Sequence, residues 1–87
     1  MPRPIATVVK AGAGFQLQLD GNPACEIVPN DSGYEFIKPR NLYSVIAFQL
    51  DGTKVPDSLS LLVTLTNACR NYGCNFKPDV AAEILKS

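Results

Sequence analysis

Two cysteines that lie five positions apart have the most obvious chemistry in this sequence. Cys69 and Cys74 belong to the stretch NACRNYGCNF at 67–76, with Gly73 directly before the second thiol. Such a pair could form a disulfide, ligate a metal ion, act as a redox pair, or pack together at the end of a helix. The spacing favours packing. If Gly73 takes the left-handed conformation that ends many helices, the two cysteines occupy the positions whose side chains meet in a Schellman motif.

The other roles of the cysteines require more than the sequence offers. A Cys69–Cys74 disulfide would close only a short loop and so would constrain the unfolded chain little. A metal site would need Cys25 to converge on the same place, with Asp79 as a fourth ligand, because the chain has no histidine. We therefore predict that the two thiols pack side by side, that Cys25 is a small buried apolar residue, and that no metal or other cofactor is bound.

The lack of histidine also limits the catalytic arrangements that the chain could form. Without imidazole there is no Ser-His or Cys-His nucleophile pair and no H-E-x-x-H zinc helix. Asp20 and Asp51 each precede a glycine in a turn pattern, and a meander gives no reason for their carboxylates to meet. The sequence therefore predicts that the protein is not an enzyme and has no catalytic residues.

Composition limits the class of protein. The length of 87 residues, with 46% hydrophobic residues, predicts a single domain over 1–87 with one modest core. Eight basic residues balance eight acidic ones, so no net charge attracts the chain to nucleic acid or to an anionic membrane. The apolar runs, such as VIAF at 45–48, are far shorter than the roughly 20 residues that span a bilayer. The N-terminal residues show no secretory signal pattern, so the chain is either intracellular or its leader has been removed, and the odd number of cysteines favours a cytoplasmic protein.

Alternating apolar residues predict strands over 4–54. The clearest case is FQLQL at 15–19, where Phe15, Leu17 and Leu19 share one face and two glutamines share the other. Asp20-Gly21 predicts a hairpin turn, since a type I′ turn needs positive φ at both central residues. Strands are expected at 5–10, 15–19, 24–28 and 33–38, with Asn22-Pro23 prolonging the first break and PNDSG at 29–33 forming a second turn.

The segment LYSVIAFQL at 42–50 fits two structures. As a strand it is apolar on both faces, as a covered central strand would be. As a helix it would be capped by Asn41 and ended by Gly52. Its apolar face would then consist of Leu42, Val45, Ile46 and Leu50. Because β-branched and aromatic residues dominate and Asp51-Gly52 repeats the earlier turn, we predict a strand.

The residues from 57 to 86 predict two helices. Asp57 or Ser58 can cap an amphipathic helix of about four turns, whose buried face is expected to carry Leu61, Leu62, Leu65, Ala68, Cys69 and Tyr72. A second helix over 78–86 begins at Pro78 and has an apolar face of Val80, Ala81, Ile84 and Leu85. The predicted fold is α+β: an antiparallel β-meander of four or five strands followed by two C-terminal helices packed on one face.

The long helix also carries a surface without charge. Its members are Leu59, Ser60, Val63, Thr64, Asn67 and Asn71. Charged residues are depleted at the centres of protein interfaces, so this surface is predicted to bind a partner protein or a second copy of the chain, giving a homodimer. The sheet or the short helix could instead wrap further round and cover it, and the sequence leaves the two interpretations equally open.

Four basic residues form a candidate phosphate-contacting patch. Lys38 and Arg40 flank Pro39 in a loop, while Arg70 and Lys77 lie near the ends of the two helices, and Tyr43 could join them. The alternative is that these are solvated charges without a common ligand.

Together these patterns favour a small non-enzymatic protein-binding module that acts as an inhibitor, an adaptor or a small subunit. Small near-neutral chains of this kind resemble accessory proteins of phages and mobile elements, including proteins that inhibit host defence complexes. The alternative function is nucleic-acid binding through the Lys38–Arg40 loop together with Arg70 and Lys77.

Overall fold

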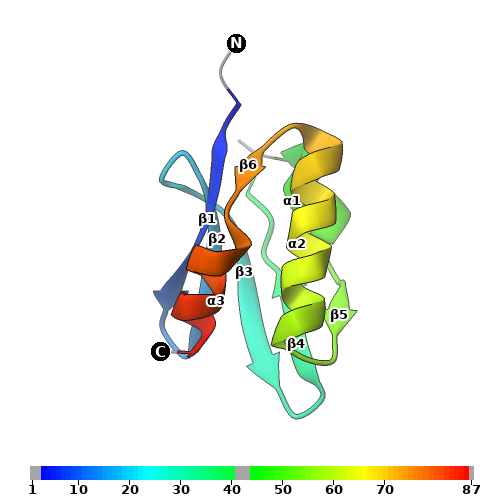
Figure 1. Cartoon of the computed structure of the whole chain (residues 1–87). Coiled ribbons are helices and arrows are strands. Elements are labelled where there is room, and N and C mark those ends of the chain that lie inside the picture. Colours follow the sequence, from blue (N-terminus) through cyan, green and yellow to red (C-terminus); the bar gives the residue numbers. More distant parts are fainter. Residues whose placement is uncertain (1–2, 41–43, 87) are drawn as a thin grey trace.

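The computed structural model describes residues 3–40 and 44–86, which form one mixed sheet and three helices (Figure 1). The elements in chain order are β1 (Ile5–Ala11), β2 (Gly14–Leu19), β3 (Asn22–Asn30), β4 (Gly33–Ile37), α1 (Ser44–Leu50), β5 (Lys54–Val55), α2 (Ser58–Tyr72), β6 (Asn75–Phe76) and α3 (Pro78–Lys86). The strand order is β5-β4-β3-β2-β1-β6. β1 to β4 are an antiparallel meander, and β6 pairs with β1 in parallel. The predicted α+β class is confirmed, and two strands of two residues each widen the predicted sheet.

The first hairpins follow the sequence pattern closely. Phe15, Leu17 and Leu19 are buried along β2, as their alternation predicts. Asp20 and Gly21 have φ of 52° and 81°, which is the positive φ that a two-residue type I′ turn requires. The Asp20 side chain also accepts a hydrogen bond from the Ile5 N–H at 2.9 Å, and its own N–H donates to the Ile5 carbonyl at 2.9 Å. This turn therefore fixes the start of β1 beside the end of β2.

β3 is longer than predicted at both ends. Asn22 and Pro23, expected to prolong a break, already pair with β2, and the strand continues to Asn30. The register shifts so that Leu17 faces Cys25 while Gln18 faces Pro23, which leaves Ala24 as the extra residue of a β-bulge. A bulge is a position where a strand tolerates proline.

The prediction of a strand over 42–50 is wrong, because α1 occupies the described part of that segment. Ile46, Ala47 and Leu50 are buried, whereas Val45 and Phe48 are exposed. Burial on one side with a helical spacing is the alternative that the sequence offered, and β-propensity is outweighed here by packing of that single face. The expected cap Asn41, together with Leu42 and Tyr43, lies outside the described residues.

The ends of α2 are capped as predicted. Asp57 is the N-cap, and its side chain accepts a hydrogen bond from the Ser60 N–H at 2.7 Å. This backbone hydrogen bond, with a further contribution from the Ser60 side chain, lowers the pKa of Asp57. At the other end Gly73 has φ of 73°, and the Cys74 N–H donates to the Cys69 carbonyl at 2.8 Å, which is the long bond of the Schellman motif.

The buried face of the helices is narrower than predicted. On α2 the buried residues are Leu61, Leu65 and Cys69, and on α3 only Ala81 is buried. Two residues that were expected on these faces are largely exposed: Tyr72 at 38% and Val80 at 55%. The helices cover one face of the sheet, but their flanks leave apolar side chains in contact with water.

Gly33, the first residue of β4, lies beside the chain that leaves β5 and leads into α2. It has φ of 130°, and a Cβ at this position would lie 2.0 Å from the Val55 carbonyl oxygen and 2.7 Å from backbone atoms of Pro56. No L side chain fits between these backbones without separating them. Gly73 also has positive φ, but a Cβ there would meet nothing within 4 Å.

Because of this difference, we expect Gly33→Ala to lower the free energy of unfolding by at least about 3 kcal/mol. The matched Gly73→Ala change carries only the cost of a left-handed side-chain residue, about 1 kcal/mol. Urea unfolding followed by circular dichroism measures both. Equal losses in the two variants would show that a side chain at Gly33 does not collide with the Val55 and Pro56 backbone.

Candidate functional site

The uncharged surface predicted on α2 is present and partly exposed. Leu59 is 71% and Val63 is 53% exposed, and Asn67 and Asn71 are exposed as well. Their spacing of four residues places these side chains in one line along the helix. We call Leu59, Val63, Asn67 and Asn71 the α2 ridge.

The remaining two residues of the predicted surface lie beside the ridge. Ser60 and Thr64 are half-buried. At 100° per residue they fall on the flank of α2 opposite Leu62, which faces α3. They therefore border the α2 ridge and do not form its exposed crest.

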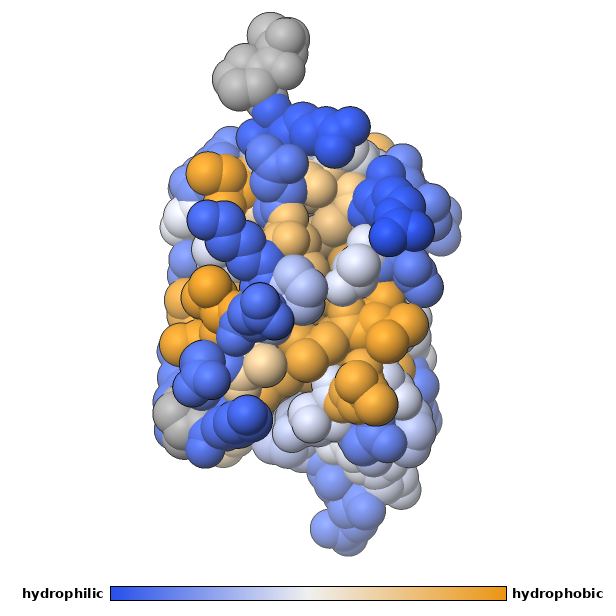
Figure 2. Space-filling view, in the orientation of Figure 1, coloured by the Kyte–Doolittle hydropathy of each residue, from blue (hydrophilic) through white to orange (hydrophobic). Residues whose placement is uncertain are grey.

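A shallow groove separates α2 from α3 next to the ridge. It has a volume of about 180 Å³, and its lining includes Leu59, Leu62, Leu85 and Tyr34. Figure 2 shows apolar side chains gathered in a band that crosses this face of the molecule from α2 towards α3. We call this groove between the two helices the α2–α3 groove. Leu59 belongs to both the ridge and the groove, so the apolar end of the ridge continues into the groove, whose lining also includes Ser58 and Lys86.

The four basic residues predicted to contact phosphate are not gathered in one place. Lys38 and Arg40 follow β4, and the Arg40 N–H donates to the Ala24 carbonyl of β3 at 2.8 Å. Lys77 follows β6, and three strands lie between β4 and β6. At about 4.8 Å per strand the two sites are roughly 19 Å apart. Arg70 is exposed on the last turn of α2. Tyr43 lies outside the described residues.

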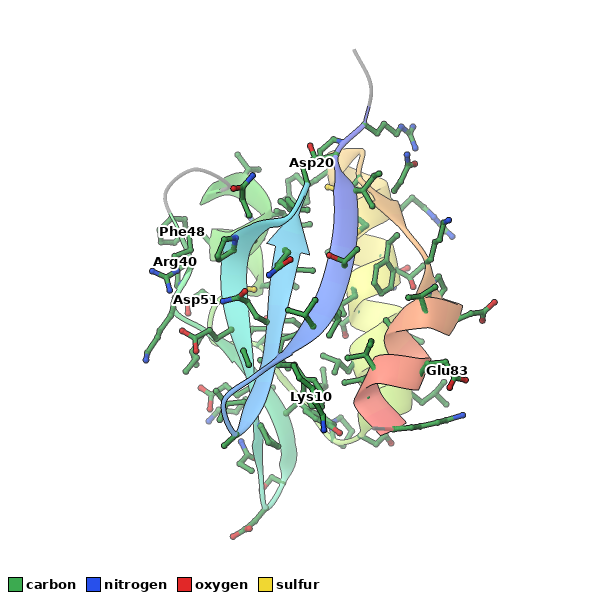
Figure 3. All side chains as sticks on the ribbon, turned by 90° about the vertical axis from the view of Figure 1, so that its left-hand side faces the viewer. Lys10, Asp20, Arg40, Phe48, Asp51 and Glu83 are labelled. Atoms are coloured by element: carbon green, nitrogen blue, oxygen red, sulfur yellow. The ribbon has the colours of Figure 1, made fainter. Side chains whose placement is uncertain are left out.

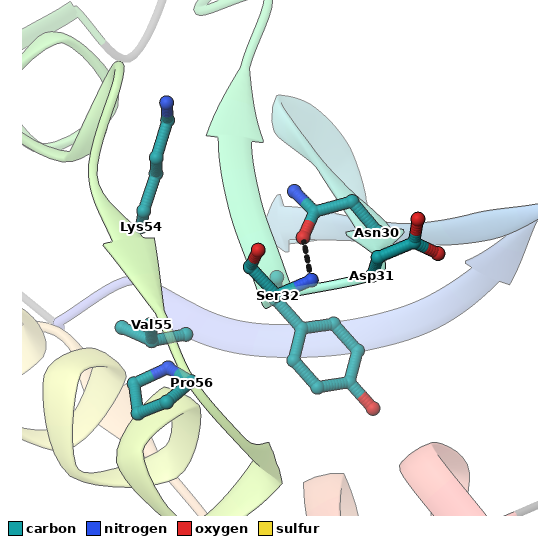
Figure 4. Close-up of a pocket in the computed structure, with 7 residues that line it drawn as sticks. Asn30, Asp31, Ser32, Lys54, Val55 and Pro56 are labelled. Carbon is teal, nitrogen blue, oxygen red and sulfur yellow. Dashed lines mark hydrogen bonds between the residues drawn. The ribbon is translucent and has the colours of Figure 1, made fainter.

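A polar hollow lies at the turn between β3 and β4 (Figure 4). It has a volume of about 490 Å³, and its lining includes Asn30, Asp31, Ser32 and Lys54. Asn30 Oδ1 accepts a hydrogen bond from the Ser32 N–H at 2.8 Å, so this side chain closes the turn. The charged ends of Asp31 and Lys54 point away from each other (Figure 4). The hollow is a consequence of the shape of the turn, and the side chains that line it do not converge on a common point.

The largest of these hollows was not predicted from the sequence. It has a volume of about 660 Å³ and lies between the outer edge of β1, the short strand β6 and the start of α3. We call it the β1–α3 groove, and the lining residues that matter here are Ile5, Val8, Phe76, Lys77, Val80 and Ala81. Its walls come from the two ends of the chain, so no local pattern reveals it. The sequence places Val80 on the apolar face of the short helix, and the structure shows that this side chain lines the groove instead of being buried.

The three cysteines are free and buried. Cys69 and Cys74 interact through their thiols, as the Schellman arrangement predicts, while Cys25 lies on β3. Burial raises the pKa of Cys69 to about 12, with the neighbouring Cys74 adding to the effect, and burial also raises the pKa of Cys74. Thiols that resist ionisation are poor nucleophiles.

Cys25 is the most deeply enclosed of the three thiols. It is 0% exposed. Burial raises its pKa to about 12, and the negative charges of Asp51 and Glu26 add to the shift. Across residues 3–40 and 44–86, no group of three or more Cys, Asp or Glu side chains is placed to hold a metal ion. Within the same residues, no helix is long and apolar enough to cross a membrane.

The raised thiol pKa values predict a loss of stability at alkaline pH. Above about pH 9 the unfolded chain releases thiol protons that the folded chain keeps until about pH 12, so the free energy of unfolding falls as pH rises through this window. Each such thiol contributes a slope of up to about 1.4 kcal/mol per pH unit. Urea unfolding between pH 8 and 11 should therefore show a shallower slope for Cys25→Ala than for the unchanged chain. Identical slopes would mean that Cys25 ionises equally easily in both states.

Comparison of the chain with known protein families, with curated proteins and with solved structures gives no significant match, so its function has to be argued from its own surfaces.

Proposed function

We propose that the protein is a non-enzymatic protein-binding module that binds its partner through the α2 ridge and the α2–α3 groove. The observation that carries this proposal is the exposure of Leu59 and Val63, 71% and 53%, on the same line of the helix. Isolated apolar side chains on a surface need no explanation, but a contiguous apolar patch is typical of an interaction site.

The chemistry of the patch also fits an interface. Its six predicted residues carry no charge, and its apolar members border amide and hydroxyl side chains that can form hydrogen bonds at a rim. Leu62 and Leu85 extend it into the groove, where a side chain of the partner can be enclosed on two sides. The expected partner surface is therefore apolar at its centre, and at its edge it meets uncharged side chains of α2 and Lys86 of α3.

A partner that binds this surface would give the chain the role of an inhibitor, an adaptor or a small subunit. The more specific role suggested by its size and charge is that of a phage or mobile-element accessory protein that inhibits a host defence complex. The identity of a protein captured by the chain from host lysate, determined by mass spectrometry, tests that role. A captured protein unrelated to defence would overturn it while leaving the binding surface in place.

The surface itself is tested by paired serine substitutions. Leu59→Ser with Val63→Ser removes the apolar crest of the α2 ridge and is expected to weaken binding of the captured protein at least tenfold, measured by calorimetry or surface plasmon resonance. The matched control is Val45→Ser with Phe48→Ser, because these side chains are 64% and 51% exposed and belong to a different helix, α1. Both double variants should remain folded, since exposed substitutions of this kind usually change stability little.

Two outcomes would contradict the proposed surface. Equal binding by the ridge variant and the unchanged chain would place the partner elsewhere, and equal loss in both double variants would indicate a general effect of lost apolar area. Light scattering distinguishes a homodimer from a complex with another protein. A mass of twice 9.4 kDa that falls to the monomer value in the ridge variant would identify the partner as a second copy.

A further inference from the structure

The two edges of the sheet differ in how far their outer backbone groups are paired. At the β4 edge, the chain after α1 returns to form β5: the Phe36 N–H donates to the Thr53 carbonyl at 3.0 Å, and the Gly52 N–H donates to the Phe36 carbonyl at 2.8 Å. At the β1 edge, β6 pairs only with Ile5 and Ala6. Beyond Ala6, no strand of the described chain pairs with the outer side of β1.

The hydrogen bonds of Ile5 show which groups of β1 face outward. Its N–H and carbonyl both bond to Asp20, on the β2 side. Successive residues of a strand direct these groups to opposite sides, so those of Val8 and Lys10 point to the outer edge. The Asn75 N–H donates to the Pro4 carbonyl at 2.8 Å, which confirms that even-numbered residues face this side.

The outward groups of Val8 border the β1–α3 groove, whereas Lys10 is exposed and lies beyond the residues that line it. Val8 lines the groove and is only 4% exposed, so its unpaired backbone lies at the floor. Val80 and Ile5 form exposed apolar walls at 55% and 52%. Figure 3 shows α3 beside the outer edge of β1, with Lys10 on the strand facing the helix. A buried backbone group without a partner is unfavourable, and a strand entering the groove would pair with it.

The chain itself shows what kind of occupant fits this edge. β6 already adds to β1 as a strand and stops after two residues, so the next positions continue an existing ladder. The one charged residue among those that line the groove is Lys77, beside the end of β6. A carboxylate would complement it. We propose that the β1–α3 groove binds an extended apolar segment of a partner protein, which pairs with β1 at Val8 and Lys10 and places a carboxylate on Lys77.

A second copy of the chain fits the groove less well. In one register of two β1 strands paired about a two-fold axis, the outward groups of Val8 bond to Lys10 of the other copy. That register brings the ammonium group of one Lys10 into a groove that already holds Lys77. Like charges oppose such pairing, whereas an acidic or C-terminal peptide group is attracted. The inference rests on the proposed role as a protein-binding module, but it assigns a different surface and a different class of segment.

The probe is an array of pentapeptides with apolar residues at alternating positions, in three sets: a free C-terminal carboxylate, a C-terminal amide with an internal Glu, and a C-terminal amide with an internal Gln. We expect the labelled chain to bind one or both carboxylate sets and to bind the Gln set at least about tenfold more weakly. The difference between the first two sets shows whether the carboxylate is terminal or a side chain.

The best peptide is then studied with variants of the full chain. Lys77→Gln should weaken binding at least about tenfold, whereas Lys54→Gln at the opposite edge should not. Lys10→Pro removes an outward N–H without touching the β2 ladder, so it should abolish binding and keep the fold. In the unchanged chain, bound peptide should slow hydrogen exchange of the Val8 and Lys10 amides and leave that of Val9 unchanged.

Several results would overturn the inference: no peptide of the array binds, Lys77→Gln binds as well as the unchanged chain, or the exchange of Val8 and Lys10 does not respond. A doubled mass in light scattering that Lys10→Pro abolishes would identify a second copy as the occupant.

If Lys10→Pro does not fold, Val80→Asp replaces it, with Val45→Asp on α1 as its control. The Leu59→Ser and Val63→Ser double variant should bind the peptide normally, so failure of the ridge and failure of the groove are told apart.

Discussion

The close approach of two neighbouring backbones at Gly33 sets where α2 begins. β4 begins beside the Val55–Pro56 segment, and any side chain at Gly33 would collide with the Val55 carbonyl oxygen. Since Asp57 caps α2 immediately afterwards, the pairing of β5 with β4 also sets the first turn of that helix. The helical period then carries Leu61, Leu65 and Cys69 over the sheet. A second glycine, at the end of α2, returns the chain to β1, so the helix is anchored to both edges of the sheet.

This arrangement explains which parts of the fold follow from the sequence. Hairpins and helix ends are local: Asp20-Gly21, Asp57 and Gly73 each act on residues within a few positions, and all three behave as expected. The segment at 42–50 is different, because its propensity favours a strand while its packing against neighbours favours a helix. Strands of two residues, such as β5 and β6, have no periodicity to detect and exist only because distant strands offer them partners.

The candidate surfaces divide in the same way. The α2 ridge could be predicted because Leu59 and Val63 fall outside the main apolar stripe of one helix. The β1–α3 groove could not, since Ile5 and Val80 are brought together by the pairing of β1 with β6. The predicted basic residues are not all gathered in one place, for the related reason that Lys38 and Lys77 follow strands that are separated by three others.

The uncovered face of the sheet has a different character from the helical side. It presents polar residues such as Thr7, Gln16, Gln18 and Glu26, and Gln18 Nε2 donates to Gln16 Oε1 at 2.9 Å. These groups bind water and one another, so this face gives a partner little apolar area to bury. The exposed apolar residues are concentrated instead on the helices and at the β1 edge. A small sheet covered on one side thus leaves two surfaces with separate chemistry, a neutral ridge and an apolar groove that holds one lysine beside the outer edge of β1. We propose that the first binds a folded partner and the second an extended one.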